Sequence, residues 1–359
     1  MKGKVFVALS GGVDSSVAAY LLKKEGYNIH GAFMKNWEEC NWHEERRSAE
    51  AVAAHLDIPF EVWDFTEEYK KYILKNFYSE YKKGKTPNPD ILCNKIVKFG
   101  YFLKKAKKEG ADFIATGHYV RKGDDGLLKK GIDENKDQSY FLWSLEKEQI
   151  EKTLFPIGEH EKKDVRMIAK KAGLNTAEKK DSQGLCFVGD IQIKDFLKGH
   201  VTTNKGKIVN EDGKDIGEHK GIAYYTEGQR EGLYIGGQKE PHYVSFRDVN
   251  TNTIIATPRE NVLNYSTKIY LKDVLLHDKN IVGKEVGVKI RYRQDDQKGI
   301  LKKLNSKYVI EFRKPQFAVS LGQSAVLYKG DVLIGGGIID KVDRQFSRIN
   351  EILKKHGNK

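Results

Sequence analysis

The sequence predicts an α/β protein in which an N-terminal domain with a parallel sheet precedes two small β-rich domains. Residues 1 to about 198 alternate short apolar strands with helical segments, which is typical of a parallel sheet with helical crossovers. From about residue 199 the chain changes to short apolar runs separated by glycine-rich turns. A chain of 359 residues is also too long for one ordinary core.

The first domain, residues 1–198, is predicted to be the one with the parallel sheet. We expect strands at residues 4–10, 28–34, 60–65 and 112–118, and helices at 15–27, 44–57, 67–83 and 93–110. Ligands of such sheets gather at the C-terminal ends of the strands. Ser10, Met34 and Gly117 fall at such ends, which predicts one shared site.

Two β-rich domains are expected to follow, at residues 199–262 and 263–359. In the central one, residues 221–237 and 243–257 are expected to form hairpins. In the C-terminal one, strand-like runs occur at residues 286–294, 308–320 and 324–339. Many short strands separated by turns favour small barrels, and we predict a C-terminal β-barrel.

Composition predicts a cytoplasmic chain with no membrane partner. No apolar run approaches the roughly 20 residues needed to span a bilayer, and the apolar stretch after the basic N-terminus is too short for a signal peptide. Three cysteines, Cys40, Cys93 and Cys186, are too few for a disulfide framework or a four-ligand zinc site. They are expected to be buried or reactive thiols, and no resident metal is expected.

Positive charge is concentrated toward the C-terminus. Lys and Arg number 63 against 50 Asp and Glu residues, a net charge of +13. Residues 268–359 contain 20 basic and 10 acidic residues and so carry +10 of that charge. A basic end on a nearly balanced body indicates a polyanionic partner such as nucleic acid, although a lysine-rich solvated surface would explain the charge equally well.

A glycine-rich stretch, ALSGGVDSS at residues 8–16, has the features of a phosphate-binding loop. Gly11 and Gly12 allow the backbone to approach a phosphate closely. The strand is expected to end at Ser10 and the helix to begin near Asp14, so that its positive N-terminal end faces the same phosphate.

The side chains of this loop suit a pyrophosphate that leaves intact. Ser10 and Ser15 offer hydroxyl donors, and Asp14 is a candidate either to cap the helix or to bind Mg²⁺. The loop lacks the lysine with which GxxxxGK loops assist phosphoryl transfer. It resembles the pyrophosphatase loop of the ATP-pyrophosphatase superfamily, whose members adenylate a carbonyl oxygen and release pyrophosphate.

A second group of residues lies in GKTPNPDILCNK, at positions 84–95. Its two prolines favour extended backbone, so Asp90 is expected to cap a helix and to place Cys93 in the first turn. The helix dipole and Lys95 would both favour a thiolate there. A lone cysteine is otherwise more often a small buried hydrophobe.

The other two cysteines give weaker signals. Cys186 lies between polar turn residues and a short apolar run, with Lys179 and Lys180 upstream, and is unconvincing alone. Cys40 has only His43 as a possible co-ligand, and two ligands do not make a metal site. We therefore interpret Cys40 as a spare thiol.

Seven stretches occur in order along the chain: SGGVDSS, TPNPDILCN, ATGHYVR, KDQSYFL, DSQGLCFVGD, EGQREGLYIGG and KIRYRQ. Together they resemble the bacterial tRNA-specific 2-thiouridylases, from residue 4 to about residue 340. The two cysteine motifs are much more specific than the loop. The resemblance implies an ATP-pyrophosphatase domain of the adenine nucleotide alpha hydrolase type. It also implies the ATP-dependent replacement of the C2 oxygen by sulfur in the wobble uridine of tRNAs for Lys, Glu and Gln.

The resemblance also implies the catalytic roles. A uracil oxygen is a poor leaving group, so it is first adenylated with ATP and Mg²⁺. Cys186 bears a persulfide received from a cysteine desulfurase or a relay protein. Cys93 is the nucleophile that attacks it, either releasing hydrogen sulfide or ending in a Cys93–Cys186 disulfide that external reductant reopens. Asp90 is a candidate acid/base residue, although capping alone would also explain it.

Binding residues follow from the same resemblance, with ordinary packing or a solvated loop as the alternative for each. Positions that match ATP contacts are Ala8, Leu9, Ser10, Gly11, Gly12, Val13, Asp14, Ser15, Met34 and Gly117. Positions that match tRNA contacts are Asn88, Pro89, Asp90, His118, Lys136, Asp137, Gln138, Arg291, Tyr292 and Gln323, the first three around the flipped uridine. The acidic insert that many relatives have after Met34 is short here, which weakens the match up to Arg47.

Two other functions fit part of the sequence. The loop alone would allow amide or amidine synthesis, but that chemistry needs neither Cys93 nor Cys186, and no glutaminase-like region is visible. A non-catalytic RNA-binding protein is the other alternative, against which the intact loop beside two motif-placed cysteines argues. The sequence identifies neither the sulfur donor nor the route of sulfur, and the family implies a monomer.

Overall fold

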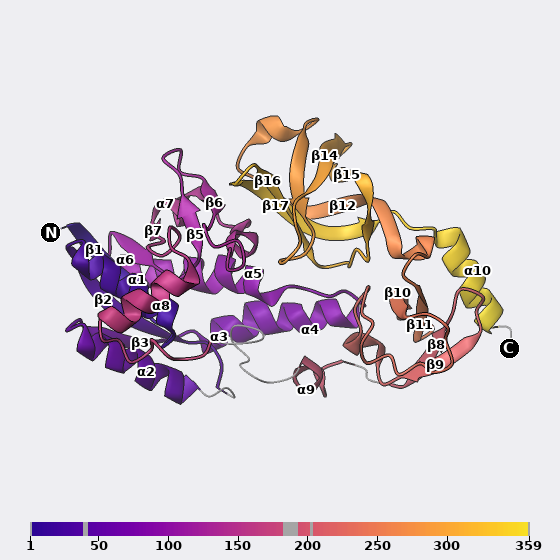
Figure 1. Cartoon of the computed structure of the whole chain (residues 1–359), viewed down its shortest axis with the longest axis horizontal. Coiled ribbons are helices and arrows are strands. Elements are labelled where there is room, and N and C mark those ends of the chain that lie inside the picture. The colour runs from indigo at the N-terminus through magenta and orange to yellow at the C-terminus, as the bar shows by residue number, and fades with distance from the viewer. Residues whose placement is uncertain (1, 39–41, 182–192, 202–203, 358–359) are drawn as a thin grey trace.

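Three structural units follow one another along the chain (Figure 1). The computed structural model describes residues 2–38, 42–181, 193–201 and 204–357. A parallel sheet covered by helices comes first, a four-stranded sheet follows, and a larger sheet then closes into a barrel. The predicted fold class, a parallel α/β domain before two β-rich domains, is confirmed.

The first unit is built on a five-stranded parallel sheet in the order β3-β2-β1-β4-β7. Its strands are β1 (Lys2–Ala8), β2 (Tyr27–Lys35), β3 (Phe60–Asp64), β4 (Phe113–Ala115) and β7 (Thr153–Leu154). In β1, Val5 and Val7 belong to one buried cluster, whereas Phe6 and Ala8 belong to another. Because successive side chains point to opposite faces of a strand, both faces of the sheet are buried.

Helices cover both faces of this sheet. The face of Val5 and Val7 is covered by α1 (Val13–Lys24), α2 (Trp42–His55) and α8 (Lys162–Lys171). Two long helical stretches cover the other face: α3 (Thr66–Glu68), η1 (Tyr69–Leu74) and α4 (Lys75–Lys82), then α5 (Pro89–Cys93), η2 (Asn94–Tyr101) and α6 (Phe102–Lys108). The shorter helices are η3 (Ser139–Leu142), α7 (Lys147–Glu151) and α9 (Ile193–Leu197). Both η1 and η2 are π-helical, a geometry often found at functional sites.

The second unit is a four-stranded sheet in the order β10-β11-β8-β9. Its elements are β8 (Gly206–Val209), β9 (Asp215–His219), η4 (Ile222–Tyr224), β10 (His242–Asp248), β11 (Thr253–Pro258) and η5 (Val262–Asn264). The predicted hairpin at residues 243–257 is confirmed by the antiparallel pair β10 and β11. The hairpin predicted at 221–237 is wrong, because this segment forms the short helix η4 and then a loop. Tyr225 and Leu233 anchor that loop in the core.

The third unit is a ring of strands closed by pairing of β12 with β17. Its elements are β12 (Tyr265–Leu276), η6 (Lys279–Ile281), β13 (Glu285–Lys289), β14 (Gln297–Leu304), β15 (Lys307–Phe317), β16 (Ser324–Lys329), β17 (Val332–Val342) and α10 (Phe346–Gly357). The C-terminal helix α10 packs back on the second unit through Ile349 and Ile352. A hairpin of the first unit, β5 (Val120–Lys122) and β6 (Leu128–Lys130), pairs with β17 and so extends the barrel sheet.

Candidate active site

The glycine-rich loop lies between β1 and α1, at the C-terminal edge of the parallel sheet. β1 ends at Ala8 and α1 begins at Val13, so the strand ends and the helix begins slightly earlier than predicted. Gly12 is the N-cap residue, and Gly11 has a φ of 77°, which costs glycine little. The first N–H groups of a helix have no partner within it, so this turn offers backbone donors to an anion.

Close packing explains two glycines of this region, one in the loop and one after β4. A Cβ atom on Gly11 would lie 2.2 Å from the Glu45 carbonyl oxygen. A Cβ atom on Gly117, just after β4, would lie 2.6 Å from the backbone of Asp14 and of Ser15. Gly117 therefore lets the end of β4 contact the first turn of α1. Its direct contact with ATP remains a prediction.

The remaining predicted ATP contacts differ in how accessible they are. Ser15 is buried, accepts the Ser10 N–H at 3.2 Å and donates to the Gly12 carbonyl at 3.2 Å, so it holds the loop in shape. Ser10 is exposed, and its hydroxyl can meet a ligand. Leu9 is buried in the core, and Met34 in β2 is half-buried against the cluster of the opposite face.

Asp14 is held by side chains from distant parts of the chain. Lys162 Nζ, at the start of α8, lies 2.8 Å from both carboxylate oxygens of Asp14. The Tyr119 hydroxyl donates to Asp14 Oδ1 at 2.8 Å. Burial, together with the charge of Asp14, raises the pKa of Tyr119, so this hydroxyl stays a donor. Asp14 makes no capping bond to α1, so the capping role is wrong and the Mg²⁺ role remains a prediction.

A second carboxylate, Asp181, completes a charge cluster beside the loop. Asp181 accepts hydrogen bonds from Lys136 at 2.7 Å and Arg166 at 2.8 Å, and Lys162 Nζ lies 2.8 Å from it. Burial opposes ionisation of Asp181, but the hydrogen bonds from Lys136 and Lys162 outweigh it and lower its pKa to about 2. Asp181 therefore fixes the Lys162 ammonium group beside Asp14.

Sequence reasoning missed Lys162, Lys179, Tyr119 and Asp181 as parts of this site. Lys179 Nζ donates to the Gly11 carbonyl at 3.0 Å and to Glu45 at 2.8 Å. No local spacing links these residues to the loop, because only the fold brings them there. The missing lysine in the loop was the one available signal that cations come from elsewhere.

Cys93 is the last residue of α5 and does not lie in the first turn as predicted. Asn88 caps this helix, since its side chain accepts the Asp90 N–H at 3.1 Å, and Pro89 takes the first helical position. The predicted cap at Asp90 is therefore wrong, and Asp90 remains a candidate acid/base residue. The influence of a helix dipole falls off beyond the first turn, so it acts less on Cys93 than predicted.

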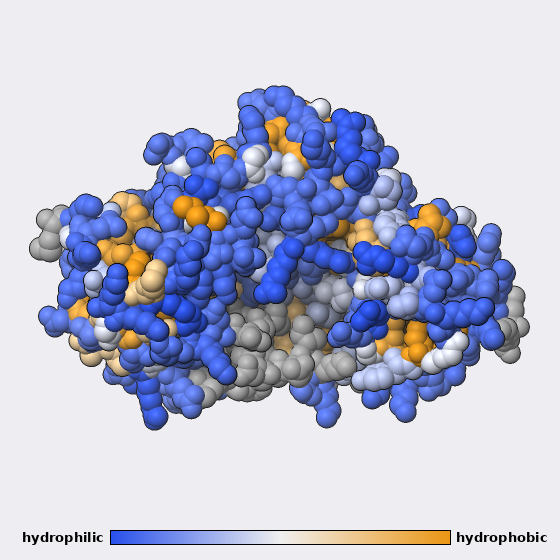
Figure 2. All heavy atoms as spheres, in the orientation of Figure 1, coloured by the Kyte–Doolittle hydropathy of each residue, from blue (hydrophilic) through white to orange (hydrophobic). Residues whose placement is uncertain are grey.

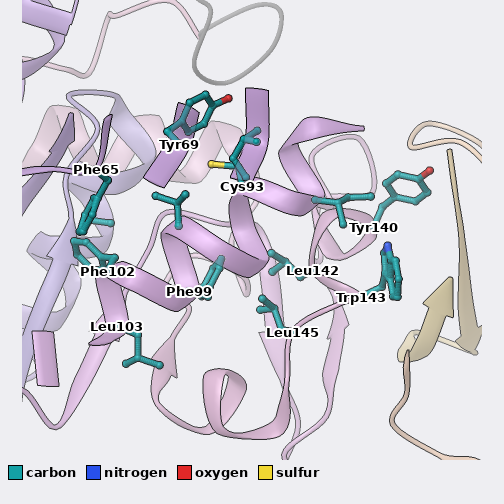
Figure 3. Packing of buried hydrophobic residues seen from close by; sticks show 14 of the residues in the cluster. Phe65, Tyr69, Cys93, Phe99, Phe102, Leu103, Tyr140, Leu142, Trp143 and Leu145 are labelled. Atoms are coloured by element: carbon teal, nitrogen blue, oxygen red, sulfur yellow. The ribbon is translucent and has the colours of Figure 1, made fainter. Parts of the chain in front are cut away.

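The Cys93 side chain is buried, with 6% of its surface exposed. It lies in the large hydrophobic cluster of the first unit, beside Tyr69 of η1 (Figure 3). Lys95, the expected neighbouring cation, has Glu146 Oε1 3.7 Å from its Nζ. Cys186 and Cys40 lie outside the described residues, so the pairing of Cys93 with Cys186 remains a prediction.

Four of the side chains that are predicted to contact tRNA form hydrogen bonds within the first unit. His118 is buried with Nδ1 2.8 Å from Thr116 Oγ1, and burial, aided by Lys98, lowers its pKa well below the usual value. Asp137 is buried and accepts the N–H groups of neighbouring residues. Gln138 accepts a backbone N–H, and Lys136 binds Asp181. Little of His118 or Asp137 is exposed, and their contact with tRNA remains a prediction.

Arg291 and Tyr292 lie where the barrel meets the other units. Arg291 donates to the carbonyl of Ala318 and, at 3.3 Å, to that of Glu227. Together with Arg293, Gln294 and Phe317 it lines an open cavity of about 360 Å³. Tyr292 packs on Phe141 of the first unit, with ring centroids 4.4 Å apart. Two arginines and an aromatic ring are the chemistry of a phosphate and base contact.

The face in Figure 2 is mainly hydrophilic and carries only small, separate hydrophobic patches. Across the described ranges, no cluster of three or more His, Cys, Asp or Glu side chains is arranged to hold a metal ion. Among the same residues, no helix combines the length and apolarity needed to cross a bilayer.

Three family models match successive parts of the chain. They are described as the tRNA methyl transferase HUP domain, at residues 3–190, the tRNA methyl transferase PRC-barrel domain, at 194–258, and the aminomethyltransferase beta-barrel domain, at 266–339. These ranges follow the three structural units. The predicted boundaries near residues 198 and 262 remain predictions.

Relatives of known name match nearly the whole chain. The tRNA-specific 2-thiouridylase MnmA of Vibrio cholerae is 46% identical over 94% of this chain and 96% of its own length. The enzyme of that name from Pseudomonas fluorescens is 46% identical over 94% of this chain and 95% of its own. A solved U34-tRNA thiolase from Methanococcus maripaludis is 22% identical over 55% of this chain and 66% of its own, with a TM-score of 0.36, too distant to add to the assignment. On the identity and coverage of the first two relatives, this chain belongs to the tRNA-specific 2-thiouridylase family.

Proposed function

We propose that this chain replaces the C2 oxygen of the wobble uridine of tRNA by sulfur and converts ATP to AMP and pyrophosphate in doing so. The observation that carries the proposal is a lysine-free, glycine-rich loop that leads into α1, at residues 8–15, in the same unit as the buried thiol of Cys93. Relatives named tRNA-specific 2-thiouridylases, 44–46% identical over 94–95% of the chain, support the same activity here. The tRNAs for Lys, Glu and Gln are the proposed substrates.

In this proposal the loop binds the pyrophosphate part of ATP. The N–H groups of the first turn of α1 and the Ser10 hydroxyl donate to phosphate oxygens, while Lys162 and Lys179 supply the positive charge that the loop lacks. Met34 and Gly117, at the ends of β2 and β4, contact the rest of the nucleotide. ATP, when bound, supplies the adenylyl group that turns the uracil oxygen into a leaving group.

Asp14 is the proposed protein ligand of the Mg²⁺ that accompanies ATP. Mg²⁺ in such sites is held by one or two carboxylates together with phosphate oxygens, so a single loop carboxylate fits. Lys162 contacts both oxygens of that carboxylate. Binding of the metal would therefore require Lys162 to move toward the phosphates, which gives the lysine a second role.

Sulfur reaches the activated base through the two cysteines. Cys186 carries the persulfide, and the Cys93 thiolate attacks its inner sulfur. This forms a Cys93–Cys186 disulfide and releases the outer sulfur, either as free hydrosulfide or directly to C2 of the uracil, and AMP departs with the oxygen. An external thiol reductant then restores both cysteines. Asp90 is proposed to move the proton at the base.

The tRNA is proposed to lie against the basic third unit, with Arg291 and Tyr292 among its contacts and Asn88, Pro89 and Asp90 around the flipped uridine. The open cavity beside Arg291 supports this placement. A persulfide donor, either a cysteine desulfurase or a relay protein, is the second proposed partner. A monomer in the cytoplasm is the proposed working state.

Replacement of the cysteines one at a time tests this function. Cys93→Ala and Cys186→Ala are each expected to abolish thiolation of a tRNA transcript supplied with ATP and a persulfide source, and to leave tRNA binding nearly unchanged. Cys40→Ala is the control and should thiolate normally. If both variants still thiolated tRNA, the mechanism would be wrong.

A further inference from the structure

A buried ion cluster lies where the three units meet. Arg247 of β10 and Glu227 of the second unit approach to 3.0 Å, and their side chains are 1% and 5% exposed. Arg344, which follows β17, lies 3.8 Å from Glu227 and is 7% exposed. Burial opposes ionisation of Glu227, but Arg247 and Arg344 outweigh it and keep the pKa of Glu227 below its usual value. Burying charges is costly, and well-packed apolar residues would often serve stability as well.

Arg247 also contacts the segment that leads to Cys93. Its Nη2 donates to the Gly84 carbonyl at 2.9 Å and to Thr86 Oγ1 at 3.1 Å. Its Nη1 donates to the Tyr225 carbonyl at 2.7 Å, so the guanidinium plane is fixed within the second unit. Residues 83–88 join α4 to α5, and α5 ends at Cys93. The second unit is thus bonded directly to the backbone that precedes the Cys93 helix.

The barrel also forms hydrogen bonds and an ion pair with the same segment. The Thr86 N–H donates to the Leu321 carbonyl at 2.8 Å, and Gln323 Nε2 donates to the Thr86 carbonyl at 2.7 Å. Lys85 Nζ lies 2.9 Å from Asp340 Oδ1. In Figure 1, α4 extends from the first unit toward the other two, and the chain turns back from there to α5. Both β-rich units therefore hold the turn that sets where α5 begins.

We propose that Arg247 is a positioning residue for Cys93, and that Gln323 acts with it from the barrel. The forked guanidinium binds the turn at residues 84–86, the turn places the Asn88 cap, and the cap places α5 with Cys93 at its end. The two β-rich units, which hold this turn, thereby set the position of the attacking thiol. This inference rests on the proposed function, in which Cys93 is the nucleophile.

The test is the rate at which iodoacetamide alkylates Cys93 in the full chain with Cys40→Ser and Cys186→Ser, at a temperature well below unfolding. Arg247→Lys keeps the charge but loses the fork. The alkylation rate should rise about tenfold, since lost hydrogen bonds to a charged donor shift a local opening equilibrium by roughly that factor. Arg344→Lys is the matched control. It weakens the same cluster without contacting residues 84–86, and its rate should equal that of the parent.

Gln323→Ala removes the hydrogen bond from the barrel to the Thr86 carbonyl and should also raise the alkylation rate. It serves as the test if Arg247→Lys does not fold. If Arg247→Lys folds and its alkylation rate is unchanged, the positioning role is overturned. If Arg247→Lys does not fold, an unchanged rate in Gln323→Ala overturns it instead. An equal rise in both arginine variants would overturn it as well, because general loosening would then explain the effect. Alkylation needs neither ATP nor tRNA, so its outcome is independent of whether the chain thiolates tRNA.

Discussion

Lys162 Nζ of α8 lies 2.8 Å from both carboxylate oxygens of Asp14, a loop residue 148 positions earlier in the chain. Another element of the fold thus brings a lysine beside the glycine-rich loop, which has none of its own. Lys179 reaches the same loop through the Gly11 carbonyl. Cations beside a helix N-terminus strengthen a site for an anion such as pyrophosphate.

Replacement of Lys162 by Met should weaken ATP binding about tenfold, because the proposed charge-assisted contact to phosphate would be lost. Titration calorimetry with a non-hydrolysable ATP analogue measures this directly. The neighbouring Lys163, whose side chain is 72% exposed and pairs with Glu161, provides the control. Lys163→Met should bind the analogue like the parent, and equal affinities of the two variants would remove Lys162 from the site.

Gly117→Ala should destabilise the protein by about 1–3 kcal/mol, the usual cost of overpacking a core. The added Cβ would lie 2.6 Å from the backbone of Asp14 and Ser15, so the first turn of α1 must move. Gly236→Ala is the control, since its Cβ would have no neighbour within 4 Å. Urea unfolding compares the two variants, and similar midpoints would contradict the close approach of β4 to α1.

Asp181 should contribute stability that acid removes. Its pKa in the folded chain is lowered to about 2, from an ordinary value of 3.8, so its contribution is complete above pH 3.8 and is lost as the pH falls toward 2. Asp181→Asn lacks this contribution. The parent should therefore lose more stability than Asp181→Asn between pH 4 and pH 2. Urea unfolding at each pH gives the free energy of unfolding of both proteins. Equal losses in the two proteins over that pH range would contradict the ion cluster.

Two residues at the start of α5 are expected to have different roles: Asn88 stabilises the helix, and Asp90 is the candidate acid/base residue. Asn88→Ala removes the cap and should cost about 1 kcal/mol of stability. Asp90→Asn should change stability by only about 0.3–1 kcal/mol, because only its charge near the helix N-terminus is lost. If Asp90 moves a proton at the base, Asp90→Asn will lower the thiolation kcat sharply while the KM for tRNA stays constant. A normal kcat would leave Asp90 without a catalytic role.

Much of the first unit could be predicted from local pattern. Strands predicted at residues 28–34 and 60–65 occur at Tyr27–Lys35 and Phe60–Asp64. The first is a short apolar run that is largely buried inside the sheet. The second lies at the edge of the sheet and buries only Trp63. The loop after β1 was recognisable because its glycines are needed locally. Gly11 has a positive φ, and this requirement is visible in the sequence itself.

The rest was locally ambiguous or depended on contacts between distant residues. The order of Asn88, Pro89 and Asp90 allows either Asn88 or Asp90 to cap a helix, and the backbone before the proline selects Asn88. Residues 221–237 have the glycines and apolar residues of a hairpin, yet Tyr225 and Leu233 are buried in a core that only the folded second unit provides. Lys162 carries no local mark of its site.

Thiolation of the wobble uridine of tRNA by this chain is best tested by mass spectrometry of that nucleoside from cells lacking the protein. We expect 2-thiouridine to disappear from the wobble position of tRNAs for Lys, Glu and Gln. A plasmid copy of the natural chain should restore it, and a Cys93→Ala copy should not. Wobble uridines that remain thiolated in the deletion strain, or that are restored by the Cys93→Ala copy, would contradict this function.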